Sequence, residues 1–332
     1  MTLKPGPRNL VTDVEGVLVG SATDAKAETG VTVILCRDQF HAGVDVRGGA
    51  PGVREIETLS PENLVGRAHG FVLTGGSVFG LAAADGVVQT LAAKGVGFAP
   101  RAGGVGVPIV PAAVIYDLAN GGDKDWGETP PYHALGRAAA GAASESFAIG
   151  RFGAGRGGRA GLNWGGLGSA SLDLGGGLVV GAIVVNNAIG SPFMPDGRTP
   201  WAYPFELGGE FGGPYAPAPT PPDDPLPDQS KLAGMGRFAA GANTTIGLVA
   251  LSADLSTAEL KRIAMMAHDG LARAVRPAHT PFDGDTIFAV GTARIGLASG
   301  LERSLQIARL GSAAADCMAR AIARGVFAAN RA

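Results

Sequence analysis

Apolar positions in the N-terminal half of the chain form short runs of β-branched residues before any helical pattern begins. These runs predict strands at Val17–Val19, Val31–Cys36, Gly43–Val46 and Phe71–Thr74. Helical periodicity then predicts one helix from near Ser77 to Gly95 and a second from His133 to about Ser144.

The second half contains the longest continuous apolar runs. Leu178–Val185 and Thr244–Ser252 predict core strands that are neighbours in one sheet, and Ile287–Val290 predicts a further strand. Ser256 to Glu259 has the pattern of a capping box and opens a predicted helix to about Val275. The last predicted helix runs from about Glu302 to Arg324. Strands between helical layers suit an αββα sandwich, although periodicity alone does not separate it from an ordinary α/β sheet.

Pro and Gly are so frequent from Ser191 to Gln229 that neither a helix nor a central strand can persist there. We therefore expect a long loop. One interpretation is a connector that lets the chain move away from a cut site just beyond it, and the alternative is a tolerated surface insertion.

Asn243 and Thr244 stand where this loop region meets the buried strand. If the bond between them breaks, Thr244 becomes an N-terminal residue whose hydroxyl is a nucleophile and whose own α-amino group is the base. The pKa of an α-amino group is roughly 7.7–8.0, so part of it is neutral at physiological pH. The alternative is that these residues simply begin a β-strand.

Asp283 and Asp285 precede the next strand. At an extended strand entry two carboxylates at this spacing point to one side, where they can hold a proton and orient the ammonium of Thr244. Their titration would be coupled if they lie close together. A lone Asp-Gly-Asp is also typical of a turn or a cation loop.

Composition favours a compact enzyme. The chain has 332 residues, of which 46% are hydrophobic, and a net charge of -2 without a run of Lys or Arg, which argues against nucleic acid and membrane partners. The five histidines lack metal-ligand spacing, and the Gly-rich motifs lack nucleotide-binding context, so we expect no metal and no cofactor. Cys36 and Cys317 are expected to be buried free thiols. The N-terminus lacks the apolar core of a signal peptide, which predicts a cytoplasmic protein.

Charged residues make up only 17% of the chain, and its mean hydropathy is +0.20. Such a chain is expected to hide apolar surface in a homo-oligomer. The alternative is one large core that absorbs the apolar residues without an interface.

Several short segments together resemble one family of N-terminal-nucleophile hydrolases. That family contains the L-aminopeptidase/D-esterase-amidases, the β-peptidyl aminopeptidases and the nylon-oligomer (6-aminohexanoate oligomer) hydrolases. The segments that carry the resemblance, in chain order, are Val11–Val17, Val46–Ala50, Leu73–Ser77, Ala113–Asp117, Val184–Ala188, Asn243–Thr245 and Asp283–Thr286.

The resemblance implies a single domain over residues 1–332 with an αββα sandwich fold. It also implies self-cleavage into an α chain, Met1–Asn243, and a β chain, Thr244–Ala332, which assemble as a homo-oligomer of αβ units, a tetramer in related proteins. The site would lie close to a subunit boundary. The implied substrate is a small peptide, amide or amino-acid oligomer.

Further site residues follow from the same resemblance. The amide of Asn187 is expected to donate to the oxyanion, and the phenol of Tyr116 to be a second donor or a proton relay; the alternatives are an Asn that satisfies a strand end and a core tyrosine. Leu162 stands where nylon-oligomer hydrolases have a lysine, and Arg156 or Arg159 is a possible substitute for its charge only. An acyltransferase of the ornithine acetyltransferase type and an uncleaved inactive homologue remain alternative functions.

Overall fold

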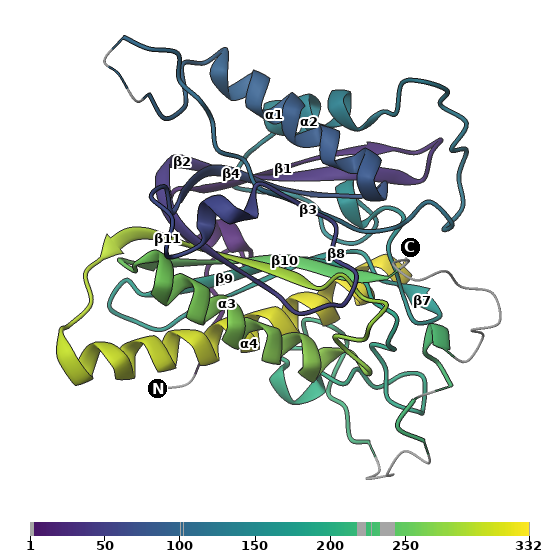
Figure 1. Ribbon diagram of the computed structural model, residues 1–332. Coiled ribbons are helices and arrows are strands. Elements are labelled where there is room, and N and C mark those ends of the chain that lie inside the picture. The colour runs from purple at the N-terminus through teal and green to yellow at the C-terminus, as the bar shows by residue number, and fades with distance from the viewer. Residues whose placement is uncertain are drawn as a thin grey trace.

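The computed structural model describes residues 3–99, 101, 103–217, 224–226, 228–232 and 243–331. Figure 1 shows four layers, with helices α1 (Ala82–Ala92) and α2 (Tyr132–Gly141) on one side and α3 (Thr257–Ala274) and α4 (Gly300–Asn330) on the other. Two layers of strands lie between the helix pairs. The expected αββα sandwich is confirmed.

The strands form one continuous mixed sheet that folds over on itself. Its order is β3-β5-β4-β2-β11-β10-β9-β8, with β1 paired to β2. The strand bounds are β1 Val17–Asp24, β2 Thr29–Val46, β3 Val53–Arg54, β4 Arg67–Thr74, β5 Ala112–Val114, β8 Leu167–Asp173, β9 Val179–Asn187, β10 Thr244–Ala253 and β11 Thr286–Ile295. A separate hairpin consists of β6 (Arg159–Ala160) and β7 (Asn163–Trp164).

Strand β2 joins the two strand layers. Its first part pairs with β1 and β4, its last part pairs with β11, and the pairing with β4 shifts register between Leu35 and Phe40. Two strands were predicted in this region, at Val31–Cys36 and Gly43–Val46, and this prediction was wrong in that they are one strand. The exposed polar residues after Cys36 interrupt the apolar pattern at the irregularity without ending the strand.

Three apolar cores hold the layers together. The core between the two strand layers contains Ile34, Phe71, Ile183, Leu248 and Phe288. A second core packs α1 and α2 on β2 and β4, and a third packs α3 and α4 on β8 to β11. Since β9, β10 and β11 have a packed core on each face, their continuous apolar runs suit their position.

Helix boundaries follow the sequence signals closely in one case and loosely in others. Ser256 is the N-cap of α3 with the predicted capping box formed. The helix predicted from Ser77 begins as the 3-10 turn η3 (Ser77–Leu81), and α4 extends beyond both predicted ends. Other 3-10 turns are η1 (Val11–Asp13), η2 (Ile56–Leu59), η4 (Gly153–Gly155) and η5 (Tyr203–Phe205). Cys36 and Cys317 are buried and free, as predicted.

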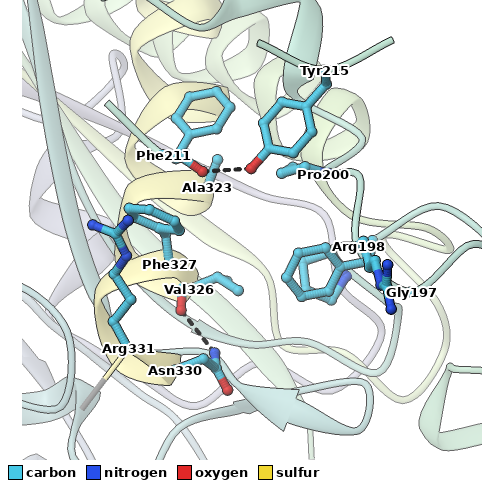
Figure 2. A pocket seen from close by; sticks show the side chains of 12 residues that line it. Gly197, Arg198, Pro200, Phe211, Tyr215, Ala323, Val326, Phe327, Asn330 and Arg331 are labelled. Atoms are coloured by element: carbon cyan, nitrogen blue, oxygen red, sulfur yellow. Dashed lines mark hydrogen bonds between the residues drawn. The ribbon is translucent and has the colours of Figure 1, made fainter. Parts of the chain in front are cut away.

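The described part of the segment after β9 is a loop, as predicted, but it is packed against α4. The side chains of Arg320 and Glu210, which are 1% and 8% exposed, form an ion pair at 2.6 Å, and the Phe211 side chain is buried in the outer core. A partly open cavity of about 300 Å³ remains between this loop and the end of α4 (Figure 2). It is lined by aromatic rings, among them Phe193, Phe211, Tyr215 and Phe327. Within the described residues, every helix is too short or too polar to cross a lipid bilayer.

Candidate active site

Strand β10 places Thr244 at its buried N-terminal end. It lies between β9, to which it is antiparallel, and β11, to which it is parallel, and all ten of its residues are buried. This register puts Thr244 directly opposite Asn187, and a parallel bridge pairs Asn243 with Asp283. The sheet therefore brings together segments that are far apart in the sequence, with Thr244 only 3% exposed.

Two groups converge on the carbonyl oxygen of Asn243. The Thr244 hydroxyl donates to it in a very short contact, and the backbone N–H of Gly284 donates to it at 3.0 Å. Gly284 also leaves space for the Thr244 hydroxyl, because a Cβ at this position would lie 2.8 Å from Thr244 Oγ1. The carbonyl before Thr244 is thus held by a hydrogen-bond donor and contacted by a hydroxyl.

Asp283 is buried among hydrogen-bond donors. Its Oδ1 accepts from the Ile189 N–H at 3.2 Å, and its Oδ2 accepts from the Thr280 N–H at 3.0 Å and the Thr280 hydroxyl at 2.6 Å. Burial, followed by the charge of Asp285, raises the pKa of Asp283, although these donors oppose the shift. The carboxyl is therefore protonated at a higher pH than an ordinary aspartate.

Asp285 connects β10 to a histidine. Its Oδ1 accepts from the Thr245 N–H at 2.7 Å, and its Oδ2 accepts from the His279 N–H at 3.0 Å and lies 2.8 Å from His279 Nδ1. The His279 ring packs edge-on against His268, with centroids 4.8 Å apart. The sequence analysis considered the histidines only as metal ligands, and it missed the contact of His279 with Asp285.

Asn187 is fully buried at the end of β9. Its Nδ2 donates to the Tyr116 carbonyl oxygen at 3.1 Å, while its Oδ1 accepts from Asn120 Nδ2 at 3.1 Å and from the Arg159 N–H at 2.9 Å. Tyr116, which is half-buried, therefore reaches the site through its backbone carbonyl in this structure. Asn187 and Tyr116 therefore lie next to each other. The contact between them uses the Tyr116 carbonyl oxygen, whereas the predicted role of Tyr116 requires its phenol.

Lys231 is a site residue that the sequence analysis missed. Its Nζ donates to Asn243 Oδ1 at 2.9 Å and to the Asn187 carbonyl oxygen at 3.2 Å. Loss of hydration lowers the pKa of Lys231 to about 7, and Arg159 adds to this effect while Asp283 opposes it. A single lysine in a Pro-rich loop has no sequence signal that would have indicated this position.

Each of the three residues linked above to the lysine of the nylon-oligomer hydrolases is open to solvent or makes other side-chain contacts. Leu162 is 66% exposed. Arg156 forms a bidentate ion pair with Glu28, at 2.9 and 2.5 Å, and the guanidinium of Arg159 stacks 3.9 Å from the centre of the Trp164 ring. The aromatic cavity of Figure 2 is separate, since its described lining contains none of the predicted site residues.

The chain is similar to known proteins over nearly its whole length. A model of peptidase family S58 matches residues 9–332. An uncharacterized aminopeptidase of Mycobacterium bovis is 42% identical over 335 residues, which covers 96% of this chain and 94% of that protein. A 6-aminohexanoate-oligomer endohydrolase of Kocuria sp. is 32% identical over 327 residues, which covers 94% of this chain and 84% of that protein.

A solved structure shares the fold at lower identity. The L-aminopeptidase D-Ala-esterase/amidase of Ochrobactrum anthropi, described as a variant of the Ntn hydrolase fold, superposes with a TM-score of 0.72 at 22% identity, covering 99% of this chain and 88% of that one. Because the family match and the relatives span nearly the whole sequence, the chain belongs to peptidase family S58 and is a peptide or amide hydrolase.

Proposed function

We propose that the chain cuts itself between Asn243 and Thr244, and that Thr244 then becomes the N-terminal nucleophile of an aminopeptidase-like amide hydrolase. The observation that supports this most is the convergence of the Thr244 hydroxyl and the Gly284 N–H on the carbonyl oxygen of Asn243. A hydroxyl beside the carbonyl of its own preceding residue suits attack on that residue.

The proposed self-cleavage has two steps. Thr244 Oγ1 attacks the Asn243 carbonyl carbon, and the Gly284 N–H stabilises the oxyanion that forms. The carbon–nitrogen bond then breaks as the Thr244 nitrogen takes up the hydroxyl proton, which leaves an ester and a free amine. Water hydrolyses the ester to give the Asn243 carboxylate and the free hydroxyl of Thr244.

The same groups would serve the mature enzyme. The new α-amino group of Thr244 accepts the hydroxyl proton as the oxygen attacks a substrate amide whose carbonyl takes the place of that of Asn243. Asp283 and Asp285 would orient the ammonium. The amide of Asn187, which lies opposite Thr244 and donates one hydrogen to the Tyr116 carbonyl oxygen, would donate its second hydrogen to the oxyanion. The phenol of Tyr116 remains a candidate second donor or relay.

The substrate we propose is a short peptide or amide with a free amino terminus. The relative at 42% identity is named an aminopeptidase, whereas the oligomer endohydrolase stands at 32%. Its similarity over 94% of the chain nevertheless makes a 6-aminohexanoate oligomer the second candidate substrate. An acyltransferase would instead transfer the acyl group to an amine faster than to water.

We further propose a cytoplasmic homo-oligomer of αβ units, a tetramer, with the site close to a subunit boundary. Large apolar side chains that are open to solvent in this single chain support an interface, namely Leu64, Val105 and Leu301. Light scattering on the processed protein tests the proposal, and a mass of one αβ unit at micromolar concentration would rule it out.

A substrate panel tests the activity. Purified wild-type protein is assayed on an L-amino acid amide, a β-amino acid dipeptide, a D-amino acid amide and a 6-aminohexanoate oligomer, each with and without an amine acceptor. We expect hydrolysis of an amino-terminal amide by protein that runs as two fragments on a denaturing gel. Hydrolysis by protein that remains one intact chain would exclude the N-terminal nucleophile.

A further inference from the structure

We propose that Lys231 is a positioning residue for self-cleavage, holding the side chain of Asn243 so that the carbonyl to be attacked stays beside Thr244 Oγ1 and the Gly284 N–H. This inference rests on the proposed self-cleavage. Lys231 precedes the proposed cut in the sequence, whereas Thr244 follows it, and Lys231 lies on a loop outside the sheet.

Lys231 contacts two residues that are neighbours of Thr244. Its Nζ donates to Asn243 Oδ1, on the residue before the cut, and to the carbonyl oxygen of Asn187, on the residue opposite Thr244. Asn243 is therefore held at its backbone and at its side chain, because Gly284 donates to its carbonyl oxygen while Lys231 donates to its side-chain oxygen.

The backbone of Lys231 is anchored in the same place. Its N–H donates to the Ile189 carbonyl oxygen at 2.9 Å, and the N–H of Ile189 donates to Asp283 Oδ1. A lysine on a loop normally extends its ammonium into water, whereas here the loop turns it toward two amide oxygens of the site. The charged groups that act on it are Asp283, before β11, and Arg159, on β6.

The protonation state of Lys231 predicts a specific pH dependence of self-cleavage. An ammonium donates stronger hydrogen bonds than a neutral amine. Because desolvation lowers the pKa of Lys231 to about 7, its hold on Asn243 weakens as pH rises through that value. An arginine at the same position stays charged throughout and keeps its hold.

The test measures self-cleavage of the full chain during cell-free synthesis, with a radiolabel pulse and a denaturing gel over time. Lys231→Met keeps the aliphatic stem and removes the donor, and we expect it to slow cleavage by roughly ten- to a hundredfold. Lys231→Arg is expected to recover much of the rate. Lys94→Met, at an exposed lysine at the end of α1, is the matched control.

Repeating the series from pH 6 to 9 separates positioning from a purely structural role. The ratio of the wild-type rate to the Lys231→Met rate is expected to fall with rising pH, while the Arg to Met ratio stays level. Titration of Asp283 is common to all three proteins and cancels in these ratios. Near-ultraviolet circular dichroism against a Thr244→Ala precursor checks that each variant is folded.

Each outcome decides the matter. Cleavage of Lys231→Met at the wild-type rate would overturn the role of Lys231 but not the proposed function. The same holds if Lys231→Arg is no faster than Lys231→Met and the ratio of the wild-type rate to the Lys231→Met rate does not change with pH. A wild-type chain that never splits after Asn243 would overturn both this inference and the proposed function.

Discussion

Strand β10 and the loop segment around Lys231 reach the same site by different physical routes. Every residue of β10 is buried, and backbone ladders to β9 and β11 fix its register on both sides. Lys231 is held instead by its backbone contact with Ile189 and by its own side-chain contacts. The sheet fixes which hydroxyl lies beside the bond that we propose is cut, and the loop adds only orientation. Substitutions in β10 should therefore lower self-cleavage and activity more than substitutions in the loop around Lys231.

The largest effect is expected at Thr244, the proposed nucleophile. Thr244→Ala removes the hydroxyl, so the chain should remain full length and lose more than about a thousandfold in activity. Thr244→Ser keeps an oxygen at the same position and should still split to some extent. Thr245→Ala is the matched control one residue along the strand and should split normally. A gel on which Thr244→Ala splits and Thr245→Ala does not would move the nucleophile by one residue.

The carboxylates beside the strand come next. Asp283→Asn and Asp285→Asn should each lower kcat by roughly a hundred- to a thousandfold with a smaller change in KM, because they orient the nucleophile rather than bind the substrate. Kinetics on processed protein measure this, with exposed Asp269→Asn as control. Unchanged kcat in both variants would reduce the pair to a structural turn.

The raised pKa of Asp283 gives the same carboxylate a pH signature. If the ionised form is required, wild-type activity should fall on acidification at a higher pH than an ordinary aspartate would cause, since the folded protein favours the protonated form there. Asp283→Asn should lack this limb of the profile.

A smaller effect is expected at Gly284, where the strand entry leaves room for the hydroxyl. The Cβ of Gly284→Ala would lie 2.8 Å from Thr244 Oγ1 and 2.7 Å from the Ala50 carbonyl oxygen, so the reacting groups must move apart. We expect self-cleavage about a hundredfold slower, as for other small misplacements of reacting atoms. Gly296→Ala, which meets open space just after β11, is the control. Equal rates in both variants would show that the close packing at Gly284 is unimportant.

The smallest effect is expected far from both routes, at the cap of α3. The Ser256 hydroxyl accepts from the Glu259 N–H, so Ser256→Ala should lower the free energy of unfolding by about 1 kcal/mol without changing self-cleavage. Denaturant unfolding of the Thr244→Ala precursor, with and without the second change, measures the loss. A slower self-cleavage in Ser256→Ala would mean that α3 influences the site.

Sequence reasoning succeeded where periodicity or capping is unambiguous. The neighbouring strands β9 and β10 and the capping box of α3 follow from long apolar runs and a local hydrogen-bond pattern. The αββα layering needed the family resemblance as well, because buried strands read the same in any sheet covered on both faces. The continuous β2 was missed since exposed polar residues interrupt its pattern.

The candidate site divides in the same way. Thr244, Asp283 and Asp285 stand at the ends of apolar strands, where polar residues are conspicuous, and the structure gathers them with Asn187. Lys231 and His279 reach the site through loop geometry, including a positive φ of 56° at His279, which no spacing in the sequence encodes. The actual contact of Tyr116 through its carbonyl likewise depends on the tertiary fold.

The most direct test of the central claim is N-terminal sequencing of the smaller fragment of purified wild-type protein. We predict a fragment that begins Thr244-Thr245-Ile246-Gly247, together with a larger fragment whose mass corresponds to an end at Asn243. A fragment that begins at Thr245 or elsewhere, or a folded and active chain without any cut, would contradict it.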